Sequence, residues 1–490
     1  MEEQRTHFYI PGKWLWIGAV LVATHLSSAF YAYLRQPSRS FHEYAQQVDF
    51  PQLGFHSPLA SWEDATAGSD SATNLQVAQN FAAGHGLSAS SGTAAAPYEP
   101  AQVEPGAPFV LGLWLKVWGA KTAMSLFCFA VLAQLLCGAI VTATAALYIG
   151  NVWALCCTAV ASGLCPPLLN HFYGISLASA EIVALIPLAL MNFALARGFR
   201  LYRDADESWR RYGFWFALAG LTLGVSALIE EGLILFMLFL AVYLALGIVR
   251  YRTRIAFRRA SLAGLTIAVV ALGVKIPVEL WRGAAAGASS TVAHGQAYWQ
   301  TALWAKHDAA TRYDAAGIGF GEALDPAAAQ TVNAYFEHGG NLPQLVSAWN
   351  LGLAVAKHPV QAFEYKAARL PVLWLGTSRW PQVRWSLVAK WCVGFYALLG
   401  VYLVLRLAAR KRIPEIVYLY ALFLLCAMPV IPFEFRYTIP VWVGLMLVPG
   451  LLIEHFRASI PGRIWGGRFR SDVPAEVGRD FAGQTHEVSV

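Results

Sequence analysis

Residues 14–34 read WLWIGAVLVATHLSSAFYAYL, an apolar stretch without any Asp, Glu, Lys or Arg. A second such stretch, LILFMLFLAVYLALGIV, covers residues 233–249. A helix needs about 20 predominantly apolar residues to cross the hydrocarbon core of a bilayer, so both stretches are predicted to be transmembrane helices. The first is longer than the apolar region of a signal peptide, and no small-residue cleavage site follows it. We therefore expect it to be retained as an anchor.

The composition of the whole chain agrees with a membrane protein. Of its 490 residues, 57% are hydrophobic and 13% are charged, whereas soluble domains have about half and about a quarter. All seven cysteines lie in apolar segments and show no metal-ligand spacing, so we expect packing residues and not disulfides. The net charge of +7 comes largely from short basic connectors, so no nucleic acid partner is predicted.

These basic connectors set the predicted orientation, because short loops rich in Lys and Arg mark the cytoplasmic side of a membrane. They lie at 197–211, 250–259, 406–412 and from Arg457 onward. Placing all of them inside predicts an all-α membrane protein with about ten transmembrane helices, two large outer segments and both termini in the cytoplasm. The predicted spans are 14–34, 122–148, 152–169, 175–196, 213–229, 232–249, 259–281, 386–408, 414–432 and 437–455.

The same map divides the chain into successive parts. These are an N-terminal tail with the first helix (1–34), a first outer loop with juxtamembrane helices (35–121), a group of transmembrane helices (122–281), a second outer segment (282–385), the last transmembrane helices (386–455) and a cytoplasmic tail (456–490).

The first outer loop has two predicted helices. The spacing of apolar residues predicts one helix from Asp70 to about Ala83, ended by a glycine at Gly84 or Gly86. The second, at 107–119, is too short to cross a bilayer and carries Lys116. We expect it to be an amphipathic helix in the outer interface.

Several charged residues that are distant in sequence meet on the outer face in this topology. Asp70 and Glu104 lie in the first outer loop, Glu230 joins two spans, and Arg436 follows the ninth span. Glu181 is placed inside the fourth span, about two turns from its outer end. Ionisable residues at membrane depth are rare and are commonly functional, so the sequence predicts a site here.

Each of these residues also has a simpler structural interpretation. Asp70 could cap its helix, Glu181 could be a buried hydrogen-bonding group, and Glu230 with Glu231 could form a solvated hairpin tip. Arg436 could extend from the membrane towards the interface. The prediction of a site therefore rests on their coincidence on one face.

The residues resemble a known family. D-x3-N-L-x2-A-x5-G-x-G from Asp70, followed by EPGAPFVLGLWLKVWG at 104–119, resembles the first luminal or periplasmic loop of GT-C membrane glycosyltransferases. Within this family, the sequence is similar to the group that uses polyprenyl-phosphate sugars. That group includes protein O-mannosyltransferases and lipid A aminoarabinose transferases. Further segments with looser likeness are CPPLLNHFYGISLASAEIVALIPLAL (165–190), LTLGVSALIEEGLILFML (221–238), AVAKHPVQAFEYKAARLPVLW (354–374) and RYTIPVWVGLMLV (436–448).

The resemblance implies a GT-C-like fold and an enzyme that moves a sugar from a polyprenyl-phosphate-linked donor to an acceptor hydroxyl. Asp70 is then the expected general base. Ser71 stands where many relatives have a second acid, so Asp70 would act alone or with a carboxylate from elsewhere, such as Glu181. No cofactor and no metal ligand are assigned, and a divalent metal stays an open alternative.

The donor phosphate needs positive charge or hydrogen-bond donors as it departs. Arg436 is the first candidate, followed by Lys366, Arg369 and His294, and Glu104, Glu181 and Glu230 are expected to bind substrate. Lys366 and Arg369, three apart on a predicted helix, are equally well explained as interfacial side chains.

The expected partners are the lipid-linked sugar, membrane lipids and a lipid, glycan or protein acceptor. We expect a bacterial inner (plasma) membrane location with the active site facing the periplasm or outside. A secondary transporter, an O-antigen ligase or polymerase, and an assembly factor that kept the fold without the chemistry remain alternatives.

Overall fold

The computed structural model is a bundle of helices, and no β-strand occurs in the residues that it describes. The described residues are 12–35, 69–88, 104–118, 123–165, 168–169, 177–202, 208–230, 233, 236–251, 254–286, 356, 359–360, 387–424 and 438–459. The helices are α1 (Gly12–Arg35), α3 (Ser69–Ala82), α4 (Gly106–Trp118), α5 (Ala123–Ala145), α6 (Val152–Gly163), α8 (Ala180–Tyr202), α9 (Trp209–Ile229), α10 (Phe236–Tyr251), α11 (Arg254–Ala286), α18 (Leu387–Ala408), α19 (Glu415–Leu422), α20 (Ile439–Leu445) and α21 (Val448–Ser459).

The length and apolar composition of the helices identify an integral membrane protein. Six of the described helices are long and apolar enough to cross a bilayer, namely α1, α5, α8, α9, α11 and α18. In α11 and α18 only 22% of the most apolar window is buried inside the protein, so most of these surfaces would contact lipid. Helices α6 and α21, with 12 residues each, and α10, with 16, are shorter. The all-α membrane fold is confirmed, whereas the total of about ten spans stays a prediction.

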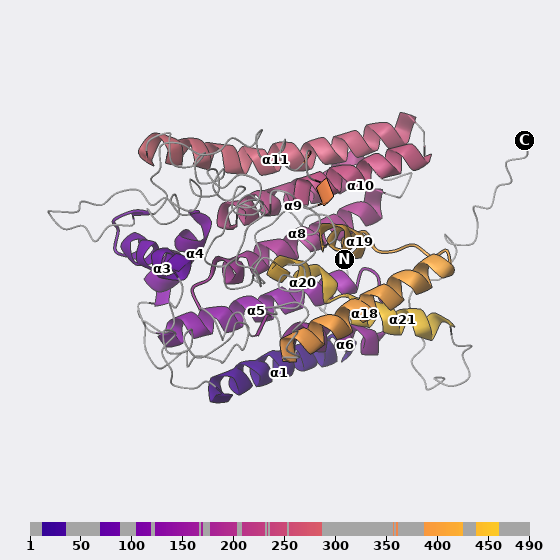
Figure 1. Ribbon diagram of the computed structural model, residues 1–490, viewed down its shortest axis with the longest axis horizontal. Helices are drawn as coiled ribbons and strands as arrows, with labels where there is room; N and C mark the ends of the chain where they lie inside the picture. The colour runs from indigo at the N-terminus through magenta and orange to yellow at the C-terminus, as the bar shows by residue number, and fades with distance from the viewer. Residues whose placement is uncertain are drawn as a thin grey trace, which may run out of the picture.

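Figure 1 shows how the long helices lie side by side along one direction. Helix α8 is central and contacts α4, α5, α9, α19 and α20. Helices α9, α10 and α11 continue the bundle on one side, while α1, α6, α18 and α21 form the other side. Helices α3 and α4 lie together at one end, which we call the α3–α4 end.

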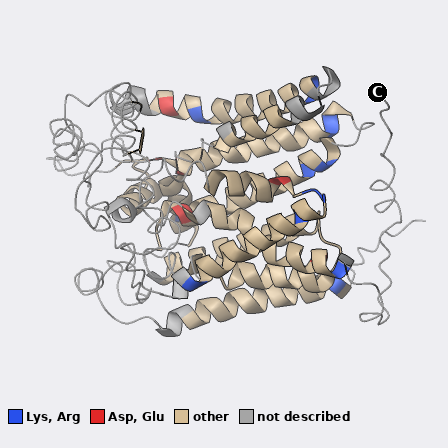
Figure 2. Ribbon diagram, turned by 45° about the vertical axis from the view of Figure 1, so that its right-hand side comes forward, with Lys and Arg blue, Asp and Glu red and all other residues tan. Residues whose placement is uncertain are grey.

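Most of the described Lys and Arg residues gather at the opposite end, which we call the basic end (Figure 2). There a guanidinium nitrogen of Arg259 in α11 donates to the carbonyl oxygen of Tyr202 at 3.2 Å. Arg412 and Glu415 form an ion pair with a nitrogen–oxygen distance of 2.6 Å. The described parts of the predicted basic connectors at 197–211, 250–259 and 406–412 border this end.

Glycines allow close contact between α9 and α11. A Cβ atom at Gly220 would lie 2.7 Å from the carbonyl oxygen of Ile267, and one at Gly224 would lie 2.8 Å from that of Ala271. Small residues four apart let two membrane helices approach until their backbones touch. Gly220 and Gly224 therefore fix the second half of α9 against α11.

Three predicted spans differ from the structure. The expected span 152–169 is shorter, because α6 ends at Gly163. The expected span 437–455 is divided into α20 and α21, with a break at Met446 and Leu447. Pro449 explains the break, because its ring would clash with the carbonyl group of Leu445, where α20 ends. The expected span 175–196 begins at Ala180, so the first turn of α8 starts later than predicted.

Candidate active site

Helix α3 brings Asp70 to the α3–α4 end. Asp70 is the second residue of the helix, in the first turn, where the helix dipole favours a carboxylate. The helix ends as predicted at Gly84, which has a φ of +91°. The backbone N–H of His85 donates to the backbone carbonyl oxygen of Asn80 at 2.9 Å. The N–H of Gly84 donates to the carbonyl oxygen of Phe81 at 3.1 Å, and the two bonds together form the Schellman motif. The structure describes the backbone of Asp70 but not its side chain.

Helix α3 is packed tightly against α4. The rings of Phe81 and Phe109 meet edge to face with centroids 5.1 Å apart. A Cβ atom at Gly112 would lie 2.9 Å from the carbonyl oxygen of Ala78, so the glycine allows the two helices to touch. Leu75 and Ala78 are fully buried in this contact region. The helix that carries Asp70 is therefore fixed on α4, which in turn contacts α8 and α9. The place of α4 in the outer interface stays a prediction.

The start of α4 lies against the end of α9. A Cβ atom at Gly106 would be 2.8 Å from the carbonyl oxygen of Leu228 and 2.7 Å from a side-chain carbon of Ile229. Glu104 lies two residues before this contact and Glu230 directly follows it in α9. Glu104 and Glu230 are distant in sequence, but the chain segments that carry them adjoin this one contact.

Glu230 ends α9 in an extended conformation. Its N–H donates to the carbonyl oxygen of Ser226 at 2.8 Å, and its own carbonyl oxygen accepts from the N–H of Leu233 at 3.1 Å. The side chain is half-buried. Glu230 is therefore partly enclosed and not fully solvated, while Glu231, the second acid of the predicted hairpin, lies outside the described residues.

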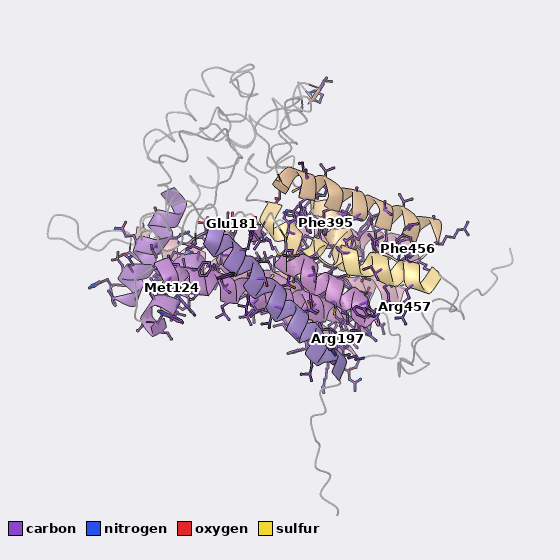
Figure 3. All side chains as sticks on the ribbon, turned by 90° about the horizontal axis from the view of Figure 1, so that it is seen from below. Met124, Glu181, Arg197, Phe395, Phe456 and Arg457 are labelled. Carbon is purple, nitrogen blue, oxygen red and sulfur yellow. The ribbon has the colours of Figure 1, made fainter. Side chains whose placement is uncertain are left out.

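Glu181 lies at the same end of the bundle. Figure 3 labels Glu181, the second residue of α8, and Arg197, which lies towards the other end of that helix and the basic end. The prediction placed Glu181 about two turns inside a span, and this is wrong, because α8 begins only one residue earlier, at Ala180. The residue is nevertheless only 4% exposed. A buried carboxylate in the first turn of a helix benefits from the positive end of the helix dipole.

Lys275 of α11 is a charged residue at this end that the sequence interpretation missed. Its ammonium nitrogen lies 3.4 Å from the carbonyl oxygen of Ala227 and 3.4 Å from Oε1 of Glu279. The lysine therefore joins α11 to the last turn of α9, three residues before Glu230. A lysine inside the apolar segment Phe257–Trp281 was the available signal, because cations are rare at membrane depth.

The remaining predicted site residues lie outside the described residues. These are His294, Lys366, Arg369 and Arg436, all candidates for the donor phosphate. Within the described residues, no three His, Cys, Asp or Glu side chains lie close enough together to hold a metal ion.

At the α3–α4 end, Glu104 and Glu230 flank the contact between Gly106 and the end of α9, and Lys275 lies against the last turn of α9. Helix α4 contacts α3, α8 and α9, so it connects the elements that carry Asp70, Glu181 and Glu230. Carboxylates in a partly desolvated site can accept protons or bind sugar hydroxyls, and an ammonium group can bind an anion. This end of the bundle is the candidate active site.

Comparison with known proteins gives a similarity of fold. No protein-family model matches the sequence, and no curated protein sequence matches it significantly. The apo oligosaccharyltransferase of Archaeoglobus fulgidus superposes with a TM-score of 0.52 at 13% identity, covering 89% of this chain and 50% of that chain. This chain therefore spans half the length of that enzyme. The similarity confirms the GT-C-like fold that the sequence resemblance predicts.

Two further structures are more distant. AglB, the archaeal oligosaccharyltransferase from Archaeoglobus fulgidus in complex with an inhibitory peptide and a dolichol-phosphate, gives a TM-score of 0.46 at 12% identity over 93% of this chain and 52% of that chain. ArnT from Cupriavidus metallidurans bound to undecaprenyl phosphate gives 0.39 at 14% identity over 90% of this chain and 78% of that chain.

Proposed function

We propose that the protein is a membrane glycosyltransferase that moves a sugar from a polyprenyl-phosphate-linked donor to an acceptor hydroxyl. The observation that carries this proposal is that α4 contacts α3, α8 and α9, the elements on which Asp70, Glu181 and Glu230 lie, and that Glu104 directly precedes the contact of α4 with α9. The fold similarity to an oligosaccharyltransferase supports the same class of chemistry.

In the proposed reaction Asp70 is the general base. Its carboxylate takes the proton of the acceptor hydroxyl while the acceptor oxygen forms a bond to the anomeric carbon. The bond between that carbon and the phosphate oxygen breaks, and the electron pair leaves with the polyprenyl phosphate. Asp70 lies in the first turn of α3, and we expect it at the membrane surface, where a lipid-linked headgroup would emerge.

The other acids are proposed to bind the sugar. Glu104, Glu181 and Glu230 would accept hydrogen bonds from sugar hydroxyls and fix the anomeric carbon in front of the acceptor. The departing phosphate would be held by Arg436 with Lys366, Arg369 and His294, which the second outer segment and the last spans contribute, and by Lys275. We further propose that the α3–α4 end faces the periplasm or the outside of a bacterial inner membrane, because the basic end has the charge of a cytoplasmic face.

The test is a comparison of lipid-linked sugars and envelope glycans, by mass spectrometry, in cells that lack the protein and in cells complemented with variants. We expect a lipid-linked sugar to accumulate and one glycan modification to disappear in the absence of the protein. The wild type and Ser71→Ala should restore the modification, whereas Asp70→Asn should not, although it reaches the membrane in equal amount.

Each result has a separate meaning. An unchanged profile of lipid-linked sugars and glycans in the deletion strain would overturn the proposed function. Restoration by Asp70→Asn would remove Asp70 as the base while leaving the glycosyltransferase proposal in place.

A further inference from the structure

An open groove lies at the basic end, far from the candidate active site. It has a volume of about 470 Å³ and is lined by Arg197 and Leu201 of α8 and by Arg211, Phe214 and Trp215 of α9. Figure 3 shows Arg197 at the opposite end of α8 from Glu181. The groove is therefore a separate feature that the proposed transfer reaction does not use.

The polar part of the groove suits an anion. Arg197 and Arg211 come from two different helices and line the same opening. The groove also adjoins the first turns of α9, whose N-cap residue Ser208 makes no side-chain hydrogen bond to the helix. The N-terminal end of a helix carries partial positive charge and N–H groups that favour phosphate. Both arginines and the N-terminal end of α9 therefore contribute positive charge to the groove.

The apolar part of the groove suits a hydrocarbon chain. Phe214 is 61% exposed, and Trp215 is half-buried between Phe193 and Phe214, with ring centroids 5.7 Å and 5.3 Å away. Two turns along α9, Leu221 is 44% exposed. Residues seven apart lie on the same face of a helix, so an apolar track leads from Phe214 towards the middle of the bilayer.

We propose that this groove binds an anionic phospholipid of the leaflet at the basic end. The phosphate would lie between Arg197 and Arg211, and one acyl chain would follow Phe214 and Leu221. A lipid fits better than a soluble phosphate compound because α9 spans the membrane and three of the five lining side chains are apolar. Basic pockets between transmembrane helices bind anionic headgroups for the same reason.

The experiment measures lipid retained by the purified full-length protein. The protein is exchanged into detergent with defined amounts of cardiolipin, phosphatidylglycerol or phosphatidylcholine, and bound lipid is counted by native mass spectrometry. We expect retention of both anionic lipids and not of phosphatidylcholine. Arg197→Gln and Arg211→Gln should each weaken retention by about fivefold, as expected for one arginine at an anionic lipid surface.

The control variants each remove one arginine elsewhere at the basic end, so they change the net charge by the same amount as the groove variants. Arg258→Gln and Arg457→Gln, neither of which lines the groove, should leave retention within about twofold of the wild type. Phe214→Ser should weaken retention of the lipids but not binding of inorganic phosphate, because it removes only apolar contact.

Three outcomes would overturn the proposal. These are equal losses in the control variants, retention of phosphatidylcholine equal to that of cardiolipin, and full displacement of the lipid by millimolar inorganic phosphate, which would indicate a site for a soluble anion. Intrinsic fluorescence and gel filtration of each variant establish that it is folded before its lipid is counted.

Discussion

Gly106 lies against the carbonyl oxygen of Leu228, so closely that a Cβ atom would be only 2.8 Å from that oxygen. This contact joins the loop that carries Glu104 to the helix end that carries Glu230. The group opposite Gly106 is the backbone of Leu228, which cannot move away as the end of a flexible side chain can. The candidate site therefore depends on the absence of one methyl group.

Gly106→Ala is expected to destabilise the protein by about 1–3 kcal/mol, as overpacking of a tight contact does. Thermal unfolding in detergent measures the change. Gly273→Ala in α11 is the matched control, because nothing lies within 4 Å of its Cβ position. Equal melting temperatures for the two variants would mean that α4 does not touch α9 as described.

Glu181→Gln is expected to lower transfer activity about 10- to 100-fold, which corresponds to the loss of a charged hydrogen bond to substrate. The amide has the same size, so the melting temperature should change little. Glu454→Gln is the control at the basic end, where its carboxylate accepts from the N–H of Asn151 at 3.3 Å. A fall in stability with unchanged activity per folded molecule would assign Glu181 a purely structural role.

Lys275→Met is expected to destabilise the protein by about 1–3 kcal/mol, since it removes the ammonium group that Glu279 pairs with in a partly buried position. Lys275→Arg should retain most of the stability. In the double variant Lys275→Met/Glu279→Gln, the loss should be smaller than the sum of the two single losses. Additive losses in the thermal unfolding would show that the pair is not coupled.

Tyr420→Phe is expected to cost about 1–3 kcal/mol, because the hydroxyl of Tyr420 donates to Oδ1 of buried Asn192 at 3.0 Å and links α19 to α8. Asn192→Leu combined with Tyr420→Phe should recover part of this loss, since no polar group is then left without its partner. Tyr418→Phe, in the same helix, is the control. Unfolding midpoints that do not distinguish Tyr420→Phe from Tyr418→Phe would contradict the interpretation.

The sequence predicted the helices best where composition alone determines them. The helix expected from Asp70 to Ala83 is observed as α3, and its end at Gly84 follows from a glycine that can take positive φ. The spans expected at 14–34 and 386–408 are observed as α1 and α18 with ends within two residues. Apolar length and a terminating glycine act locally, so a sequence carries them in full.

The candidate site could be predicted only in part. The sequence selected Glu104, Glu181 and Glu230, and the structure brings their elements together around α4. The sequence-based prediction placed Glu181 too deep in its span and missed Lys275. The start of a membrane helix is not marked by hydropathy when apolar residues such as Ile175 and Leu177 precede it, and the importance of a lysine depends on what it contacts.

The sequence by itself determined that the chain enters a bilayer, which segments are helical and which connectors carry positive charge, because transfer of apolar surface from water and the cost of burying charge depend on composition. Only the tertiary structure decided that α4 contacts both α3 and α9, with Glu104 and Glu230 on the two sides of the α4–α9 contact, and that Arg197 and Arg211 line one groove. The position of α4 depends on close contacts at Gly106 and Gly112, and the packing of α8 on α9 includes Gly198 against the ring of Phe216. At such positions the absence of a side chain matters only once the opposing group is in place.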